Sequence, residues 1–410
     1  MMSKKSPQLR FKGFTDAWEE RKLSELIQKG GSGGTPKSTN KTYYDGDIPF
    51  LGISDISKSN GYIDDTEKHI SEKGLNNSSA WIVPKGAISL AMYASVGKLA
   101  ILNTDAATSQ AFYNMVFEYE SIRDYVYHRL GRANDLGEWT KLISTGTQAN
   151  LNADKVKNFE IQVPQSIDEM KDISTFFNQL DIFITLQQRK LDLLKEQKKG
   201  YLQKMFPKNG AKVPELRFAG FADDWEERKL GDILIERKTK SKISENIPLL
   251  AFASGQGVIN RSERKTNNRD FLTKDVNSKV YLLTKYNDIV YNPSNLKYGA
   301  IDRNKYGTGV ISPIYVTFET NQVPEFIELI VTSHNFKKKA LQYEEGTVTK
   351  RQSVKPENLL TLNISISKSK EEQQKIGSFF QQLDDTIALH QRKLDLLKEQ
   401  KKGFLQKMFV

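Results

Sequence analysis

The sequence predicts an α+β fold with an internal pseudo-two-fold repeat. We expect two strand-rich α/β domains, held apart by two long antiparallel helices that pair as a coiled coil. Two repeated passages support this. Gln188–Phe206 recurs about 205 residues later as Gln391–Phe409, with one difference in 19 positions. Pro7–Leu23 recurs as Pro214–Leu230, with 13 of 17 positions identical. The stretches between these passages are almost unrelated in sequence. The two halves of the chain therefore share their flanking segments and differ in the segment between them.

The first domain is expected over residues 1–163, where apolar runs alternate with turn signals such as Asp45-Gly46-Asp47 and Pro84-Lys85-Gly86. A short helix is expected over Ser121–Arg132, with Tyr125 and Leu130 facing inward. The strands are expected at Ile48–Ile53, Ala80–Val83, Ala87–Ala91, Leu99–Leu102 and Ala111–Phe117.

The second domain is expected over residues 209–366, with a helix at Pro324–Leu341 whose apolar residues fall at helical spacing. Val96–Ile101 can be aligned with Leu296–Ile301, which favours two domains of the same fold with different sequences. The strands are expected at Lys279–Leu283, Asp288–Tyr291, Ala300–Asp302 and Gly309–Phe318.

Each domain is followed by a long helix, expected over residues 164–208 and 367–410. Apolar positions alternate at spacings of three and four once Gln187, Lys198, His390 and Lys401 fill the gaps, as in a coiled-coil seam. A helix of about 40 residues is about 60 Å long, and the chain must return between the helices, which favours antiparallel pairing. The alternative is that each helix packs only on its own domain. The predicted seam residues are Leu180, Ile184, Leu191, Leu194, Leu383, Ile387, Leu394 and Leu397.

Composition narrows the function classes. The net charge of +11 favours a polyanionic partner such as nucleic acid, the alternative being a merely basic protein. The chain has no cysteine, which excludes disulfides and indicates a cytoplasmic location. The four histidines have no ligand-like spacing, so no metal site is expected. No apolar run approaches the roughly 18 residues that span a membrane, and the N-terminus has no signal-peptide core.

Two motifs resemble those of enzymes, but each lacks residues that the enzyme motif requires. Gly30–Thr39 reads as a Gly-rich phosphate loop, but Pro36 replaces the glycine before the lysine and removes a needed N–H. Asn292–Asn295 lacks the second proline and the aromatic residue of an amino-methyltransferase motif. Since no carboxylate pair or nucleophile–base set stands out, we expect a non-catalytic chain.

A binding signature remains, in which basic and amide side chains interleave with aromatic ones in turn-rich segments. Such side chains hold phosphates and read base edges; ordinary solvated loops are the alternative. In the turns these residues are Tyr93, Ser95, Lys98, Asn295, Lys297, Tyr298, Arg303 and Lys305. Two polar bends before the long helices add Thr147, Gln148, Asn150, Thr349, Lys350 and Arg351.

At this point the chain resembles a type I restriction-modification specificity (S) subunit over essentially its whole length. The resemblance rests on Trp18-Glu19…Leu23 and Trp225-Glu226…Leu230, the turn Gly146-Thr147-Gln148…Leu151, and the paired Lys/Leu-rich helices. Gly33–Ile56 is similar to the family's G-T-P…G-D-I-P opening of a target recognition domain, which adds Thr35, Lys37 and Ser38 to the predicted DNA contacts. The second half lacks this opening, and has Val348 where the first bend has Gln148.

The resemblance implies a non-catalytic adaptor. Each recognition domain would read half of a bipartite, asymmetric site in double-stranded DNA. The helices would measure the unread spacer and dock two methylation subunits. No cofactor is implied in this chain, because S-adenosylmethionine, ATP and Mg belong to the methylation and restriction subunits. The alternatives are a stand-alone DNA methyltransferase or nuclease, or a scaffold that does not bind DNA.

Overall fold

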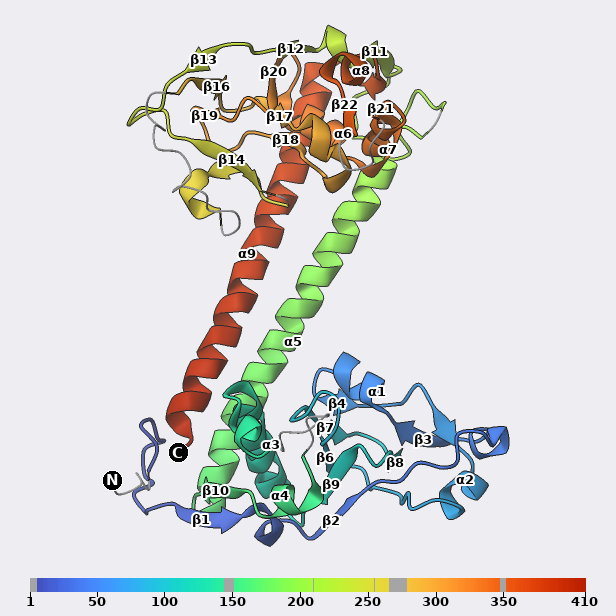
Figure 1. The fold of residues 1–410 in the computed structure, drawn as a ribbon, viewed down its shortest axis with the longest axis vertical. Coiled ribbons are helices and arrows are strands. Elements are labelled where there is room, and N and C mark those ends of the chain that lie inside the picture. The colour runs from blue at the N-terminus through green and yellow to red at the C-terminus, as the bar shows by residue number, and fades with distance from the viewer. Residues whose placement is uncertain (1–5, 144–150, 209, 254, 265–278, 347–351) are drawn as a thin grey trace. The chain divides into compact units, whose positions relative to one another are not determined.

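The computed structural model describes residues 6–143, 151–208, 210–253, 255–264, 279–346 and 352–410. The chain divides into two compact units (Figure 1). Unit 1 comprises residues 1–191 and 390–410, and unit 2 comprises residues 192–389. Each unit therefore holds one strand-rich domain, part of one long helix and part of the other. The two long helices are α5 (Ile167–Lys204) and α9 (Lys370–Met408).

Unit 1 is built around a five-stranded sheet of order β2-β9-β6-β7-β4, beside a three-stranded sheet of order β5-β3-β8. Helix α3 contributes the buried Tyr125, Val126 and Leu130 to a core shared with Trp18 and Ile88. The strands are β1 (Glu19–Lys22), β2 (Lys29–Ser32), β3 (Ile48–Leu51), β4 (Tyr62–Ile63), β5 (His69–Ile70), β6 (Ile88–Ala91), β7 (Leu99–Leu102), β8 (Ala107–Thr108), β9 (Phe112–Val116) and β10 (Glu160–Val163). The helices are α1 (Ile53–Lys58), α2 (Glu72–Asn76), α3 (Glu120–Asp135) and α4 (Ala153–Lys157).

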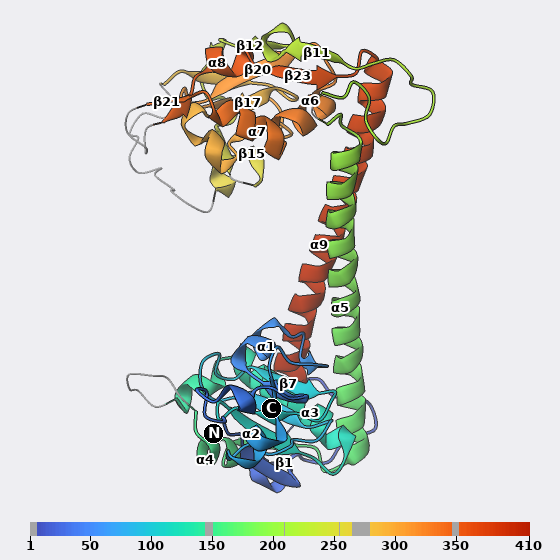
Figure 2. The same cartoon turned by 90° about the vertical axis from the view of Figure 1, so that its right-hand side faces the viewer.

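Unit 2 is built around a four-stranded sheet of order β12-β20-β17-β18 and a three-stranded sheet of order β13-β16-β19. Helices α6 and α7 pack on one face of the larger sheet (Figure 2), where Phe326 and Phe336 join its core. The strands are β11 (Glu226–Lys229), β12 (Leu234–Glu236), β13 (Lys240–Ser241), β14 (Leu250–Ala253), β15 (Gly257–Asn260), β16 (Tyr281–Thr284), β17 (Ile289–Tyr291), β18 (Ile301–Arg303), β19 (Gly309–Ile311), β20 (Val316–Thr320), β21 (Glu344–Glu345), β22 (Ser353–Val354) and β23 (Asn363–Ile366). The helices are α6 (Pro324–Val331), α7 (His334–Leu341), α8 (Pro356–Leu360) and the 3-10 helix η7 (Pro293–Tyr298).

The two units share a topology despite their different sequences. The order β2-β9-β6-β7 in unit 1 corresponds to β12-β20-β17-β18 in unit 2. The first strand of each domain also pairs with the last in one register, because Glu19 lies opposite Val163 and Glu226 lies opposite Ile366. The predicted internal repeat, in which two domains share a fold but differ in sequence, is confirmed.

Three expected elements are wrong in detail. Ala80–Val83 forms no strand, and Val83 alone pairs with Ala106 before Pro84, which lacks an N–H. The expected strand Gly309–Phe318 is two strands, β19 and β20, interrupted around Pro313. The expected helix Pro324–Leu341 is α6 and α7, because Ser333 caps a new helix by accepting a hydrogen bond from the Phe336 N–H.

The long helices pair antiparallel, as predicted, and each unit supplies its own contacts. In unit 1, Asp181 near the start of α5 binds Lys401 near the end of α9 at 2.5 Å. The Gln187 side chain also meets the His390 ring at 2.9 Å. In unit 2, Lys198 near the end of α5 binds Asp384 near the start of α9. The polar residues of the predicted seam thus carry cross-helix bonds.

The apolar seam residues lie inward along both helices. Leu191 and Leu394 are each 1% exposed and Leu194 is 7% exposed. The other predicted seam residues are half-buried: Leu180, Ile184, Leu383, Ile387 and Leu397.

The repeated passages before β1 and β11 act as straps, which we define as residues 7–18 and 214–225. In the first strap, Arg10 donates two hydrogen bonds to Glu169 at 2.6 and 2.7 Å, and the Trp18 indole donates a third at 3.3 Å. The same strap donates the Leu9 N–H to the carbonyl of Lys407 at 2.9 Å. One strap therefore holds the first turn of α5 and the last turn of α9.

The second strap repeats these contacts in unit 2. Arg217 donates two hydrogen bonds to Glu372 at 2.6 and 2.9 Å, and the Trp225 indole donates one at 3.2 Å. The Leu216 N–H donates to the carbonyl of Lys204 at 2.8 Å. Burial opposes ionisation of Glu372, but its bonds from Arg217 and neighbouring donors outweigh burial and lower its pKa. The repeated sequence is thus the fastening of the helix pair.

Candidate nucleic-acid interface

In unit 1, strand register brings separate loops to one end of the main sheet. The end of β6 at Ala91 lies opposite the start of β9 at Phe112. The end of β2 at Ser32 lies opposite Tyr113, next to it. The Ala91 N–H donates to the carbonyl of Lys98, just before β7. The loop after β2 and the β6–β7 loop therefore emerge together.

Six predicted contact residues lie at this end, and all six are exposed: Thr35, Lys37, Ser38, Tyr93, Ser95 and Lys98. The hydroxyl of Thr35 donates to the side-chain oxygen of Gln110, which precedes β9. Ser95 takes a positive φ of 62°, so the β6–β7 loop turns sharply and presents Tyr93, which is 38% exposed. The arrangement offers hydroxyl, amide, aromatic and cationic groups on one surface.

The Gly-rich segment before Thr35 has a packing role. A Cβ on Gly33 would collide with the backbone oxygen of Thr108, and a Cβ on Gly34 with Ser79. The chain needs glycine there because it passes against these neighbours. This agrees with the rejection of a phosphate loop at Gly30–Thr39.

In unit 2, the equivalent sheet end carries η7 between β17 and β18. Tyr291 at the end of β17 lies opposite Ile301 at the start of β18, so η7 occupies the place of the β6–β7 loop. Asn295 is exposed and Tyr298 is 68% exposed. The Lys297 ammonium lies 5.6 Å from the centre of the Tyr298 ring and 3.6 Å from Glu344. Both units thus present an exposed tyrosine in the equivalent loop.

The prediction that Arg303 contacts DNA is wrong. Arg303 is 2% exposed and lies at the far end of β18, opposite Ile289. Its guanidinium binds Glu325 at 3.0 Å and Glu328 at 2.7 Å, and donates to Gln381 of α9 at 2.9 Å. It therefore fastens the second domain to the long helix.

Lys305 lies near Arg303, away from η7. Its ammonium binds Glu328 at 2.5 Å while the side chain stays 45% exposed. Burial opposes its charge, but Glu328 outweighs burial and raises the pKa of Lys305. Burial and Glu328 together raise the pKa of Asp302 to about 6. Because Lys305 is engaged by a carboxylate, the sheet end with η7 is the better surface for an anion.

Six predicted residues lie outside the described part of the chain: Thr147, Gln148, Asn150, Thr349, Lys350 and Arg351. The described residues beside them reach the same sheet ends. In unit 1, the Leu151 N–H donates to the carbonyl of Met92 at 2.9 Å. In unit 2, the Tyr291 hydroxyl donates to the carbonyl of Val354.

Sequence reasoning missed Gln110 and the pair of Lys29 with Trp81. The Trp81 indole donates to the carbonyl of Ser32 at 3.1 Å, and the Lys29 ammonium lies 4.3 Å from the ring centre. Both features lie beside the loop after β2. Neither has a local sequence signal, because each depends on which strands become neighbours.

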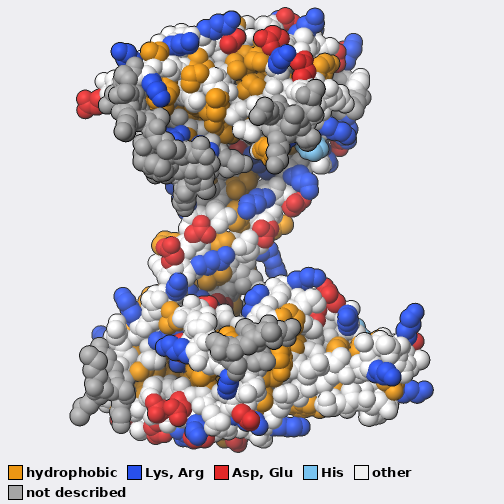
Figure 3. Space-filling view, in the orientation of Figure 1, with side chains coloured by type: hydrophobic (Ala, Val, Ile, Leu, Met, Phe, Trp, Pro, Cys, Tyr) orange, Lys and Arg blue, Asp and Glu red, His pale blue; other side chains and the backbone are white. Residues whose placement is uncertain are grey.

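Charge is mixed on the face of the molecule that Figure 3 shows. On the face in Figure 3, Lys and Arg side chains alternate with Asp and Glu and do not gather into a single field. The net charge of +11 therefore gives a general attraction to polyanions, while loop chemistry has to supply discrimination.

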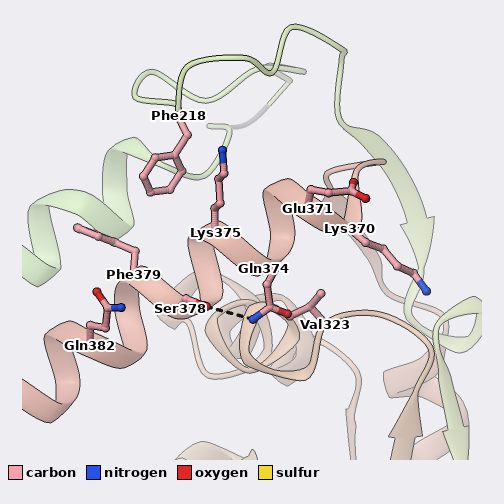
Figure 4. A pocket seen from close by; sticks show the side chains of 9 residues that line it. All are labelled: Phe218, Val323, Lys370, Glu371, Gln374, Lys375, Ser378, Phe379 and Gln382. Atoms are coloured by element: carbon pink, nitrogen blue, oxygen red, sulfur yellow. Dashed lines mark hydrogen bonds between the residues drawn. The ribbon is translucent and has the colours of Figure 1, made fainter.

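A groove of about 700 Å³ lies at the start of α9 in unit 2 (Figure 4). Phe218, Val323 and Phe379 contribute apolar surface, and Lys370 and Lys375 line it from α9. Val323 follows β20, so the groove lies at the sheet end opposite η7. The nine described residues that line it include no histidine and no pair of carboxylates. The lining therefore combines apolar surface with the charged side chains of Lys370, Glu371 and Lys375.

Across the described residues, no group of three or more His, Cys, Asp or Glu could hold a metal ion. No described helix is long and apolar enough to cross a membrane. The interface residues themselves offer hydrogen bonds, ring faces and positive charge.

Comparison with known proteins agrees with this organisation. The family model for the type I restriction modification DNA specificity domain matches residues 15–196 and 222–399. The MjaIX type I restriction enzyme specificity subunit of Methanocaldococcus jannaschii is 29% identical over 225 residues, which are 53% of this chain and 51% of that protein. The chain thus aligns with about half the length of this curated relative.

Two solved structures share the fold. The type I restriction-modification S subunit from M. genitalium has a TM-score of 0.65 at 14% identity, covering 99% of each chain. A chain from a structural study of complex assembly in the type I R-M system has a TM-score of 0.52 at 13% identity, covering 96% of this chain and 98% of that one.

Proposed function

This chain belongs to the family of type I restriction modification DNA specificity domains, and we propose that it is the DNA-sequence specificity subunit of such a system. The relatives are named as specificity subunits. Both halves of the chain match the family model, so the chain carries two specificity domains.

The observation that carries the proposal is the pair of equivalent sheet ends with different side chains. One presents Thr35, Gln110 and Tyr93, while the other presents Asn295 and Tyr298. Hydroxyl and amide groups read base edges, and lysines hold phosphates. Two domains of the same fold with different DNA-contacting side chains would recognise two unlike half-sites, which together form an asymmetric bipartite target.

The helix pair would set the length of the unread spacer. Half-sites read from one face of a duplex lie about one helical turn, 34–36 Å, apart. The cross-helix bonds of Asp181 with Lys401 and of Lys198 with Asp384 would fix the register of the pair.

The chemistry would reside in partners. Two methylation subunits would dock on the repeated elements and methylate adenine using S-adenosylmethionine, and restriction subunits would supply ATP- and Mg-dependent cleavage. The complex would act on double-stranded DNA in the cytoplasm.

A selection experiment tests this function. The chain, assembled with its methylation subunits, is incubated with random duplex DNA, and the bound DNA is sequenced. We expect one asymmetric motif of two short halves with a fixed spacer. The double substitution Asn295→Ala with Tyr298→Ala relaxes one half and leaves the other. A single contiguous motif, or no enrichment, contradicts the proposal. Stoichiometric binding of S-adenosylmethionine by the chain alone would instead indicate a stand-alone methyltransferase.

A further inference from the structure

The β6–β7 loop of unit 1 has a strained backbone. Ala94 has a φ of 24° and Ser95 a φ of 62°, although neither is a glycine. Such values are costly for residues with a side chain, and they persist only where the surrounding structure imposes them. The Ser95 hydroxyl makes only a long contact, 3.4 Å from the Ser57 hydroxyl at the surface. The Gly97 N–H closes the loop by donating to the carbonyl of Ala91 at 3.0 Å, so the surroundings of Gly97 affect the position of the whole loop.

Gly97 lies against a buried tryptophan. Trp139 is on the 3-10 helix η3 (Glu138–Lys141) and is 2% exposed. A Cβ on Gly97 would lie 2.5 Å from Cδ1 of the Trp139 ring and 3.0 Å from its Nε1. The same Cβ would lie 2.6 Å from the side-chain oxygen of Asn134. The loop backbone therefore contacts the indole directly, and only glycine leaves room for this approach.

Charged and aromatic groups of unit 1 hold the tryptophan in place. The neighbouring Glu138 accepts hydrogen bonds from Arg129 at 2.9 Å and Arg132 at 2.7 Å, and both arginines are on α3. The Trp139 ring lies 4.5 Å from the Phe159 ring, centre to centre. The Arg129 guanidinium lies 5.5 Å from the centre of the same Phe159 ring. Helix η3 is thus fixed to α3, and the indole is a rigid support for the loop.

Core packing alone does not explain a tryptophan at position 139. Within the described part of the chain, its indole N–H has no hydrogen-bond partner. A buried donor without a partner costs stability, and a phenylalanine would bury an aromatic ring without that cost. The atoms nearest to Gly97, Cδ1 and Nε1, belong to the five-membered ring that phenylalanine lacks. The part of the side chain that is expensive to bury is therefore the part that supports the loop.

We propose that Trp139 is a positioning residue for recognition of the half-site that unit 1 contacts. By supporting the loop at Gly97, it sets where the loop presents its side chains to DNA. Those side chains are Tyr93, Ser95 and Lys98. This rests on the proposed function, because it takes the β6–β7 loop as a DNA-contacting loop. It adds that a buried residue outside the contact surface determines base preference in the first half-site.

The equivalent loop of unit 2 is supported differently. It forms η7, in which the Asn292 side chain accepts a hydrogen bond from the Ser294 N–H at 3.1 Å. Gly299 ends η7 with a φ of 82° and holds the place of Gly97. Among the described residues, the atom nearest to a Cβ on Gly299 would be Nζ of Lys337, at 3.9 Å. Since η7 is stabilised by its own hydrogen bonds, the second half-site provides an internal control.

The test is selection from a random duplex DNA pool by the full chain assembled with its methylation subunits, followed by sequencing of the bound DNA. A mismatched base pair costs about 5-fold to 150-fold in affinity. Trp139→Ala should reduce this penalty about 10-fold at the most discriminating position of the first half, and leave the second half and the spacer unaltered. Gly97→Ala should act on the same half, because its Cβ displaces the loop from the indole. The double variant should lose less than the two single losses combined, because the collision is removed.

Two further variants separate positioning from stability. Trp139→Phe keeps an aromatic ring beside Phe159 and removes the support at Gly97, so it should fold and relax the first half in the same direction. Ile173→Ala truncates a residue of the same core that is also 2% exposed. It should lower the stability of unit 1 and keep the first-half preference.

The outcomes distinguish this inference from the function on which it rests. An unaltered first-half preference in both Trp139 variants overturns the inference and leaves the specificity role intact. Equal relaxation of both halves, or an equal shift in Ile173→Ala, overturns it as well, because the effect would then follow from stability. Absence of any enriched motif with the wild-type chain contradicts the proposed function itself.

Discussion

Removal of Arg10 tests whether the straps stabilise the helix pair. Glu169 is 1% exposed and takes two hydrogen bonds from Arg10, at 2.6 and 2.7 Å. Arg10→Ala leaves this carboxylate buried with the Trp18 indole, at 3.3 Å, as a remaining side-chain donor. Stranding one partner of a buried pair costs about 3–5 kcal/mol. At a denaturant slope of about 3 kcal/mol per M, the urea midpoint of unit 1 should fall by about 1–1.7 M.

An exposed ion pair on the same domain provides the matched control. Arg21 binds Glu25 at 2.7 Å, but the two side chains are 40% and 46% exposed. Arg21→Ala should cost about 0–1 kcal/mol, because water replaces the partner. The pairs have nearly the same length, so a difference between the variants measures burial.

The assay is urea unfolding followed by hydrogen exchange and mass spectrometry. Peptides from residues 167–180 report on unit 1 without interference from unit 2. The double variant Arg10→Ala with Glu169→Gln should recover part of the loss, since it removes the stranded charge. Equal midpoint shifts for Arg10→Ala and Arg21→Ala would contradict a stabilising role of the buried Arg10–Glu169 pair.

Three further results are expected. Arg303→Ala should destabilise unit 2 by about 3–5 kcal/mol in urea unfolding, because Glu325 and Glu328 lose their shared cation; weaker DNA binding at unchanged stability would contradict this. Because Tyr298 is 68% exposed, Tyr298→Ala should change the free energy of unfolding by less than about 0.5 kcal/mol. The same variant should show about a 10-fold loss of DNA affinity in a binding titration. Burial and the charge of Lys401 lower the pKa of His128 from 6.5 to about 4. The unfolded chain then binds more protons between these values, so stability is lost as pH falls from about 6.5 to 4, by up to about 3 kcal/mol. His128→Gln should flatten this pH dependence, and an unaltered profile would count against a buried neutral histidine.

The long helices could be predicted because their signal is local and extended. A three-and-four spacing over nearly 40 residues is hard to mistake, and near-identity of the two copies required related surroundings. Antiparallel pairing followed from chain connectivity. The alignment of Val96–Ile101 with Leu296–Ile301 predicted one shared fold, and β7 and β18 do hold equivalent places in the two sheet orders. The strand pairing makes Leu99 equivalent to Ile301, two residues from that alignment.

The predictions were wrong or incomplete where the role of a residue depends on partners that are distant in the sequence. Arg303 looked like a loop cation, but its carboxylates come from Glu325 and Glu328 on a helix that follows two more strands. Gln110 had no local signal, since Thr35 reaches it only through the pairing of β2 with β9. The helix break before Ser333 depended on one capping hydrogen bond that competes with a continuous helical pattern.

The most direct test of where specificity resides exchanges one recognition domain and keeps the straps and the long helices. Residues 24–159 of this chain are replaced by the equivalent domain of another family member, which leaves both straps and both helices unaltered. The modified adenines in the host genome are then mapped. We expect that one half of the bipartite motif changes while the other half and the spacer length persist. A change in both halves, or an unchanged motif, would contradict the assignment of specificity to the segments that do not repeat.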